Sequence, residues 1–137
     1  MKPYSELFRA YRDASRVENY YKCTLEHCVR GLEFALNRKW YDFSTFNVKE
    51  YEHYEKVKNG DLNWIIPGKF LAFMGPIDPQ PNERITGHKA SSYINIFKHL
   101  NVTKVIRLNE PRYSAQAFLE SGIEHDDFIF VDGSVPP

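Results

Sequence analysis

Apolar residues recur at helical spacing along much of the chain. Thr24, a residue suited to the N-cap position, precedes one such pattern, which predicts an amphipathic helix over residues 24–39. Asn47 and Glu50 form a potential capping box at the start of a second helix, which Asn59-Gly60 would end. Three further helices are predicted, over residues 3–11, 91–100 and 113–120.

The second predicted helix combines a narrow apolar seam with charged flanks. The seam consists of Val48, Tyr51, Tyr54 and Val57. This arrangement is typical of a linker helix that lies across a surface. Glu50, Glu52 and Glu55 on the same helix allow two interpretations. The favoured one is a solvated face, and the other is a substrate-binding acidic wall that recognises a basic peptide.

Between these helices the pattern changes to that of strands. Residues 64–66 and 70–73 are apolar and flank the turn pair Pro67-Gly68, which predicts a hairpin. Residues 105–108 are predicted to form a further short strand, and residues 128–131 form an apolar run of the kind that is buried on both faces of a parallel sheet. We therefore expect an α/β fold, in which a helical N-terminal segment and a linker helix pack on one partial, mixed and mainly parallel sheet with flanking helices.

Composition and charge narrow the class of protein. The 137 residues suffice for one ordinary domain, and 18 Lys and Arg balance 18 Asp and Glu, so no nucleic-acid footprint is expected. The longest apolar region, residues 64–77, is interrupted by Pro and Gly and is too short for a membrane span. Two cysteines cannot build a disulfide framework and the N-terminus has no apolar signal segment, so we expect a soluble intracellular protein.

Asp132 is the residue most suggestive of chemistry, because it directly follows the apolar run at residues 128–131. In open α/β sheets, ligands bind beyond the carboxyl ends of the strands, where a carboxylate could act as a general acid. Asp132-Gly133 is also a frequent turn pair, and the spacing alone favours a turn. Both interpretations remain open on the residues themselves.

Other candidate sites are weak. Cys28 follows a histidine as a phosphatase nucleophile would, but Phe34 stands where such a loop needs an arginine, and the pattern predicts a buried, inert core thiol. The spacing of Cys23, His27, Cys28 and His53 does not match a zinc site, and no glycine-rich phosphate loop is found, so we expect neither metal nor cofactor. The remaining histidines are predicted to be solvated: His88, His99 and His125.

Six runs of residues together form a recognisable pattern. They are YRDAS at 11–15, EYEHYE at 50–55, NGDLNWIIPGKFLAF at 59–73, NVT at 101–103, RLN at 107–109 and DGS at 132–134. The pattern strongly resembles the cell-division-cycle-fourteen dual-specificity protein phosphatases. The likeness covers nearly the whole chain and is loosest over residues 16–22 and 77–89.

The resemblance implies two tandem phosphatase-like domains joined by a linker helix, with catalysis in the second domain. It places residues 1–43 in the tail of the non-catalytic domain, residues 44–59 in the linker helix and residues 60–137 in the first half of the catalytic domain. It also places Asp132 on the mobile acid loop, where the carboxyl protonates the leaving hydroxyl, and so favours the catalytic interpretation of this residue. Phosphoprotein substrates, among them cell-cycle proteins with phosphoserine before proline, and a location in the nucleus, cytoplasm or spindle pole are further implications.

The chain departs from the family in one large respect. The family's signature loop of His-Cys, five residues and Arg is not among the 137 residues. Without a thiolate to accept the phosphoryl group, we expect the chain alone to be inactive and to need the remainder of the catalytic domain as its partner. Two hypotheses follow: a portion of a protein phosphatase, or a non-catalytic interaction module or pseudophosphatase.

Overall fold

The computed structural model describes residues 23–79 and 87–131. The chain divides into two compact units, residues 1–46 and residues 47–137, and each is described by itself. The helix predicted over residues 3–11 lies outside the described residues.

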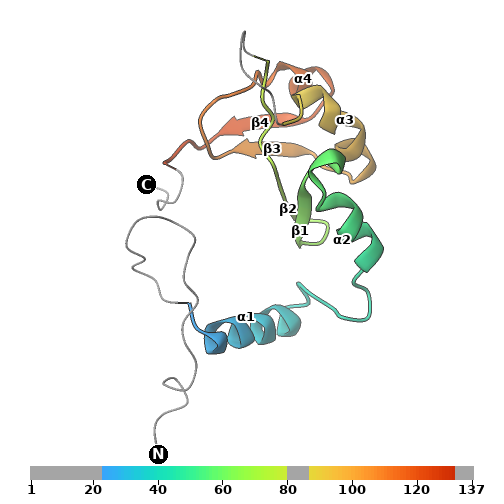
Figure 1. Ribbon diagram of the computed structural model, residues 1–137, viewed down its shortest axis with the longest axis vertical. Coiled ribbons are helices and arrows are strands. Elements are labelled where there is room, and N and C mark those ends of the chain that lie inside the picture. The colour runs from blue at the N-terminus through green and yellow to red at the C-terminus, as the bar shows by residue number, and fades with distance from the viewer. Residues whose placement is uncertain (1–22, 80–86, 132–137) are drawn as a thin grey trace, which may run out of the picture. The chain divides into compact units, whose positions relative to one another are not determined.

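The described part of the first unit is built around the predicted amphipathic helix, α1 (Leu25–Asn37; Figure 1). Thr24 is its N-cap, and the Thr24 side chain and the His27 side chain satisfy each other's backbone N–H groups in a capping box. No residue of α1 is buried. The expectation of a buried Cys28 is therefore wrong, because this thiol is exposed.

The second unit begins with α2 (Val48–Tyr54), capped as predicted by Asn47, whose Oδ1 accepts a hydrogen bond of 3.1 Å from the Glu50 N–H. The predicted end at Asn59 is wrong. The chain becomes extended at Lys56 and then forms the 3₁₀ helix η2 (Val57–Asn59). Of the predicted seam residues, Tyr54 packs against the core of the unit, whereas Val48, Tyr51 and Val57 are exposed.

Gly60 ends η2 in a left-handed conformation, with φ of 119°. A Cβ atom at this position would lie 3.0 Å from Leu62 Cδ2 and 3.3 Å from Tyr93 Cε1. We expect Gly60→Ala to lower the free energy of unfolding by about 1–2 kcal/mol, because alanine is strained in this region and the neighbouring core side chains must move. Urea unfolding measures the loss. Gly31→Ala, a helical position with open space around it, should cause no loss, and equal losses would contradict the account.

The predicted hairpin is confirmed. Strand β1 (Leu62–Ile66) pairs antiparallel with β2 (Phe70–Phe73). The turn between them contains Gly68 at φ of 71°, and the Lys69 N–H donates a 2.9 Å hydrogen bond to the carbonyl oxygen of Ile66.

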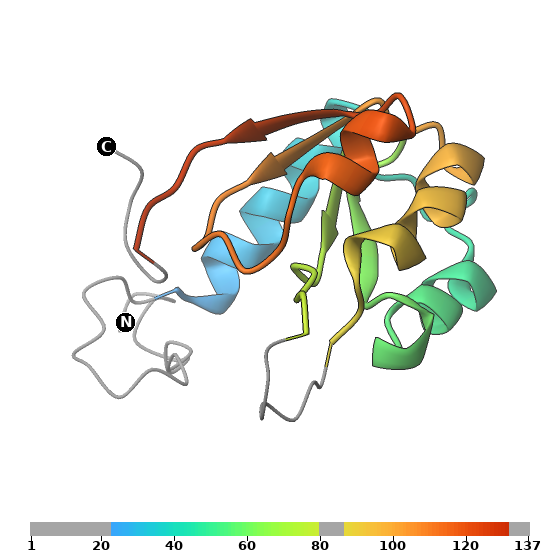
Figure 2. The same cartoon turned by 90° about the horizontal axis from the view of Figure 1, so that it is seen from above.

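The rest of the second unit contains a β-α-β arrangement. After α3 (Ala90–His99), strand β3 (Lys104–Arg107) runs parallel to β4 (Glu124–Asp127), with α4 (Gln116–Glu120) between them in the sequence. Figures 1 and 2 show α3 and α4 on the same side of the β3–β4 pair. The α/β class and the β-α-β unit are confirmed, but the described strands form two separate two-stranded sheets, where one sheet was expected.

The core of the second unit lies between α3, α4, β1 and β3. Its buried residues are Leu62, Ala90, Tyr93, Phe97, Val105, Tyr113, Phe118 and Ile123. Aromatic rings meet at the centre of this core, where Phe97 contacts Phe73, Tyr93 and Phe118. The Tyr93 hydroxyl lies 2.9 Å from the carbonyl oxygen of Gly60, and burial raises the pKa of this phenol to about 12. The core thus joins the linker end to the β-α-β unit.

The predicted strand at residues 128–131 is wrong in its position. The parallel strand lies four residues earlier, in the polar sequence Glu124–Asp127. Phe128 and Phe130 still donate backbone hydrogen bonds, to the carbonyl oxygens of Arg107 and Leu108, so the segment continues along β3. Its side chains are not buried as predicted, since Phe128 is 60% and Val131 76% exposed.

Candidate functional site

The candidate site lies where β3 and β4 end, because their carboxyl ends lie at the same edge of the parallel pair. Val105 and Arg107 point into the core from β3, while Lys104 and Ile106 point outward. Asp132 follows five residues after the last residue of β4 and lies outside the described residues. The described part of the site therefore consists of the groups that hold the ends of β3 and β4 together.

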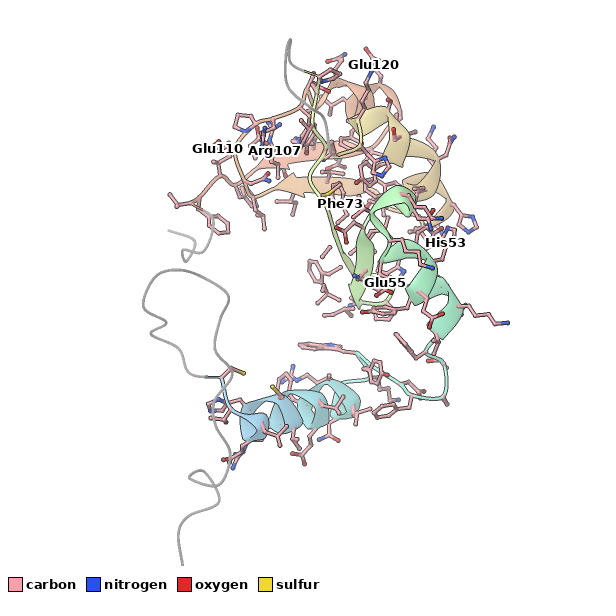
Figure 3. All side chains as sticks on the ribbon, viewed as in Figure 1. His53, Glu55, Phe73, Arg107, Glu110 and Glu120 are labelled. Atoms are coloured by element: carbon pink, nitrogen blue, oxygen red, sulfur yellow. The ribbon has the colours of Figure 1, made fainter. Side chains whose placement is uncertain are left out.

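An ion pair between Arg107 and Asp127 joins the two strand ends. Arg107 Nε donates to Asp127 Oδ1 at 2.8 Å, and Nη2 donates to Oδ2 at 2.7 Å. The third donor, Nη1, binds the carbonyl oxygen of Tyr113 at 2.7 Å. Arg107 is 8% exposed, and the guanidinium lowers the pKa of the Asp127 carboxyl. Because both contacts to Asp127 are charge-assisted and bidentate, the pair fixes the ends of β3 and β4 relative to each other. Figure 3 labels Arg107 in this position.

His125 lies beside this pair and is buried, with a side chain that is 3% exposed. Its Nε2 is 2.9 Å from the Tyr113 hydroxyl, its Nδ1 is 3.7 Å from Asp127 Oδ1, and its ring stacks on Phe118. The prediction of a solvated His125 is wrong. The same prediction is wrong for His88, which is half-buried and contacts the carbonyl oxygen of Val57, and it is confirmed for His99.

Burial of His125 makes the stability of the second unit depend on pH. Desolvation lowers the pKa of His125 below its ordinary value of 6.5, with smaller opposing effects from Asp127 and Asp126 and a lowering effect from Arg107. The unfolded chain then binds more protons than the folded chain as pH falls below 6.5, so stability is lost over that range. Asp127, whose pKa is lowered from 3.8, adds a second loss at more acidic pH.

We therefore expect a lower urea midpoint at pH 5.5 than at pH 7.5. His125→Gln retains a neutral polar side chain and should reduce the difference between the two midpoints. The matched control is His99→Gln, an exposed position in α3, which should retain the wild-type difference. A His125→Gln variant with the full wild-type difference would show that His125 is not the responsible group.

The loop after β3 is tied to the segment that follows the hairpin. Asp78 Oδ2 accepts a 2.7 Å hydrogen bond from the Ser114 N–H, and the Asp78 N–H donates to the carbonyl oxygen of Arg112 at 2.9 Å. Since Tyr113 lies between these two residues, the loop is held from both sides: by Asp78 and by Arg107.

The predicted acidic residues of the linker make none of the described contacts around Arg107 and Asp127. Glu50 is half-buried, and its Oε2 accepts a 3.4 Å hydrogen bond from the side-chain amide of Asn47 at the start of α2. Glu52 and Glu55 are exposed, and Figure 3 labels Glu55. Across residues 23–79 and 87–131, no three His, Cys, Asp or Glu side chains come together in a way that could hold a metal ion.

Sequence reasoning missed the cluster of Arg107, Tyr113, His125 and Asp127. One signal was available: Arg107 stands two residues after Val105, and alternate residues of a strand share a face. An arginine on a core-facing position needs a carboxylate partner, because a buried unpaired charge is costly. The sequence alone does not show which carboxylate this is.

Comparison with known proteins identifies the family, although no model of a known protein family matches the chain. The chain is 47% identical over 130 residues to human dual specificity protein phosphatase CDC14A, a match that covers 92% of this chain and 21% of that protein. The chain belongs to the CDC14 family. It is also 43% identical to the tyrosine-protein phosphatase cdc-14 of Caenorhabditis elegans and 37% identical to the tyrosine-protein phosphatase CDC14 homolog of Schizosaccharomyces pombe.

The alignments with the nematode and the yeast protein each cover 94% of this chain. The same alignments cover only 18% of the nematode protein and 25% of the yeast protein. The chain thus spans about a fifth of the length of the curated CDC14 proteins it matches. Among the described residues, no helix is both long and apolar enough to cross a membrane.

Proposed function

We propose that the chain is a portion of a protein phosphatase that hydrolyses phosphoserine, phosphothreonine and phosphotyrosine, and that it supplies the general acid, Asp132. The observation that carries this proposal is the 47% identity to human dual specificity protein phosphatase CDC14A across 92% of the chain. Phosphoprotein substrates follow from that name, with proline-directed cell-cycle proteins as the narrower expectation. No cofactor, nucleic acid or membrane is part of the proposal.

The proposed reaction assigns one step to this chain. A cysteine thiolate attacks the phosphorus atom, an arginine binds the phosphoryl oxygens, and Asp132 gives its proton to the departing hydroxyl oxygen. The first two groups must come from the remainder of the catalytic domain, because neither cysteine of the 137 residues is followed by arginine six positions later. The ion pair of Arg107 and Asp127 holds the end of β4, from which the chain continues to the proposed acid five residues later.

The domain assignment and the substrate contacts belong to the same proposal. Residues 1–43 would end the non-catalytic domain, residues 44–59 would connect the two domains, and residues 60–137 would begin the catalytic domain. The exposed carboxylates of Glu52 and Glu55, with Glu50 at the start of α2, would form an acidic face for basic residues of a substrate. The nucleus, the cytoplasm and the spindle pole or centrosome are the proposed locations.

A second candidate function is a non-catalytic interaction module or pseudophosphatase. It differs from the first candidate in needing no cysteine nucleophile. The transcript downstream of the Pro137 codon distinguishes the two functions. The phosphatase proposal expects an in-frame sequence of His-Cys, five residues and Arg, whereas a stop codon at this point would support the interaction module.

A further inference from the structure

The two cysteines of the chain meet at the start of α1. Cys23 Sγ lies 3.7 Å from Cys28 Sγ, within reach of a sulfur hydrogen bond. Both thiols are free, and Cys28 is exposed to solvent. They are also the only cysteines in the sequence. This pair belongs to the first unit and plays no part in the proposed phosphoryl transfer.

The capping box explains why the two sulfur atoms lie together. Thr24 is the N-cap, so Cys23 precedes the cap and Cys28 is the fourth residue of the helix. These two positions face each other in capped helices, where they commonly hold a pair of apolar side chains. The reciprocal hydrogen bonds of Thr24 and His27 fix the angle at which the chain enters the helix, and therefore hold the two thiols near each other.

We propose that Cys23 and Cys28 form a reversible modification site, a dithiol that a low-molecular-weight disulfide such as glutathione disulfide oxidises to an intramolecular disulfide. The sulfur atoms must approach from 3.7 Å to about 2.05 Å, the length of a disulfide bond. Because Cys23 precedes the N-cap and Cys28 lies in the first turns of α1, the bond would join the residue before the helix covalently to the helix.

The reaction proceeds by two thiol–disulfide exchanges. The Cys28 thiolate attacks one sulfur of glutathione disulfide, forming a mixed disulfide and releasing one glutathione thiolate. The Cys23 thiolate then attacks the Cys28 sulfur and releases the second glutathione. Two protein thiols are oxidised, one glutathione disulfide is reduced to two glutathiones, and the two thiol protons pass to them.

The order of attack follows from the surroundings of the two thiols. Cys28 is exposed, whereas Cys23 is partly covered. The hydrogen bond with Cys28 raises the pKa of the Cys23 thiol. Because Cys28 is the more accessible of the two thiols, it is the one that reaches an external disulfide first.

Thiol counting on the full chain tests the proposal directly. The chain is equilibrated in glutathione redox buffers, quenched with acid, alkylated and analysed by mass spectrometry. The disulfide form is a monomer that carries no alkyl group and is two hydrogen atoms lighter than the unmodified dithiol chain. We expect the equilibrium constant for this form to be at least roughly fivefold larger in native buffer than in concentrated urea, the equivalent of one N-cap interaction. An equal or smaller native constant, or mainly dimers and doubly glutathionylated chains, would overturn the proposal.

A pair of threonine variants tests the role of the capping box. Thr24→Ala removes the N-cap side chain and should lower the native constant towards its value in urea. Thr45→Ala, an exposed position in the same unit, is the matched control and should leave the constant unchanged. If Thr24→Ala and Thr45→Ala give the same constant, the capped helix does not hold the dithiol together and the proposal fails.

Discussion

Asp132→Asn is expected to slow the hydrolysis of a phosphoserine-proline peptide by roughly 10²–10⁴-fold, in a protein whose chain continues through the Cys-x5-Arg loop. The same change should have little effect on an activated aryl phosphate. A serine oxygen leaves as a high-energy alkoxide unless it is protonated, whereas an activated aryl oxygen departs readily without a proton. Phosphate release from the two substrates, measured with wild type and variant, gives both factors.

Asp126→Asn is the matched control for this experiment. Asp126 lies on β4 and pairs with Lys104, so Asp126→Asn removes a carboxylate that is six residues from Asp132 in the sequence without removing the proposed acid. Its rates on both substrates should remain close to those of wild type. If Asp132→Asn reduces both substrates by the same factor, or neither, Asp132 is a turn residue and the assignment of the acid is wrong.

Asp127→Ala is expected to lower the free energy of unfolding by clearly more than the loss of a surface ion pair does. The variant leaves Arg107, which is 8% exposed, without its counter-charge, and a buried charge without a partner is strongly destabilising. The 43% exposure of the Asp127 side chain moderates the loss, because water screens an exposed charge. Urea unfolding of the full chain measures the loss.

Glu124→Ala on the same strand is the control for this prediction. Glu124 pairs with Lys104 at the surface, where ion pairs contribute at most about 1 kcal/mol. In addition, the double variant Arg107→Leu/Asp127→Leu should recover part of the loss, because it removes the buried charge as well as its partner. Equal losses for Asp127→Ala and Glu124→Ala would contradict a role of the buried ion pair in holding β3 and β4.

The elements that were predicted well are those with local signals. Thr24 and Asn47 are N-caps because each side chain accepts a backbone N–H of its own first turn, which depends on residues only three positions away. The hairpin is also local, since the turn at Pro67-Gly68 joins adjacent strands. The end of α2, by contrast, was missed. The backbone becomes extended at Lys56, two residues after Tyr54, whose side chain packs against the core.

The position of β4 was missed because contacts between strands decide it. The segment Glu124–Asp127 is polar, but Lys104 pairs with Glu124 and Asp126 on one face, while Arg107 binds Asp127 at the edge. These partners come from a strand about twenty residues earlier, so hydrophobic periodicity favoured the apolar run that follows. The candidate site shows the same limit: Asp132 could be selected from its place after that run, but the cluster around Arg107 depends on the packing of the fold.

The central claim is that this chain forms part of a phosphatase and supplies its general acid. The measurement that tests it most directly is the release of inorganic phosphate from a phosphoserine-proline peptide by the protein that the full transcript encodes, with the Asp132→Asn variant measured in parallel. The account predicts release by the wild type and a loss of roughly 10²–10⁴-fold in the variant. No release by the wild type, or equal release by both proteins, would contradict it.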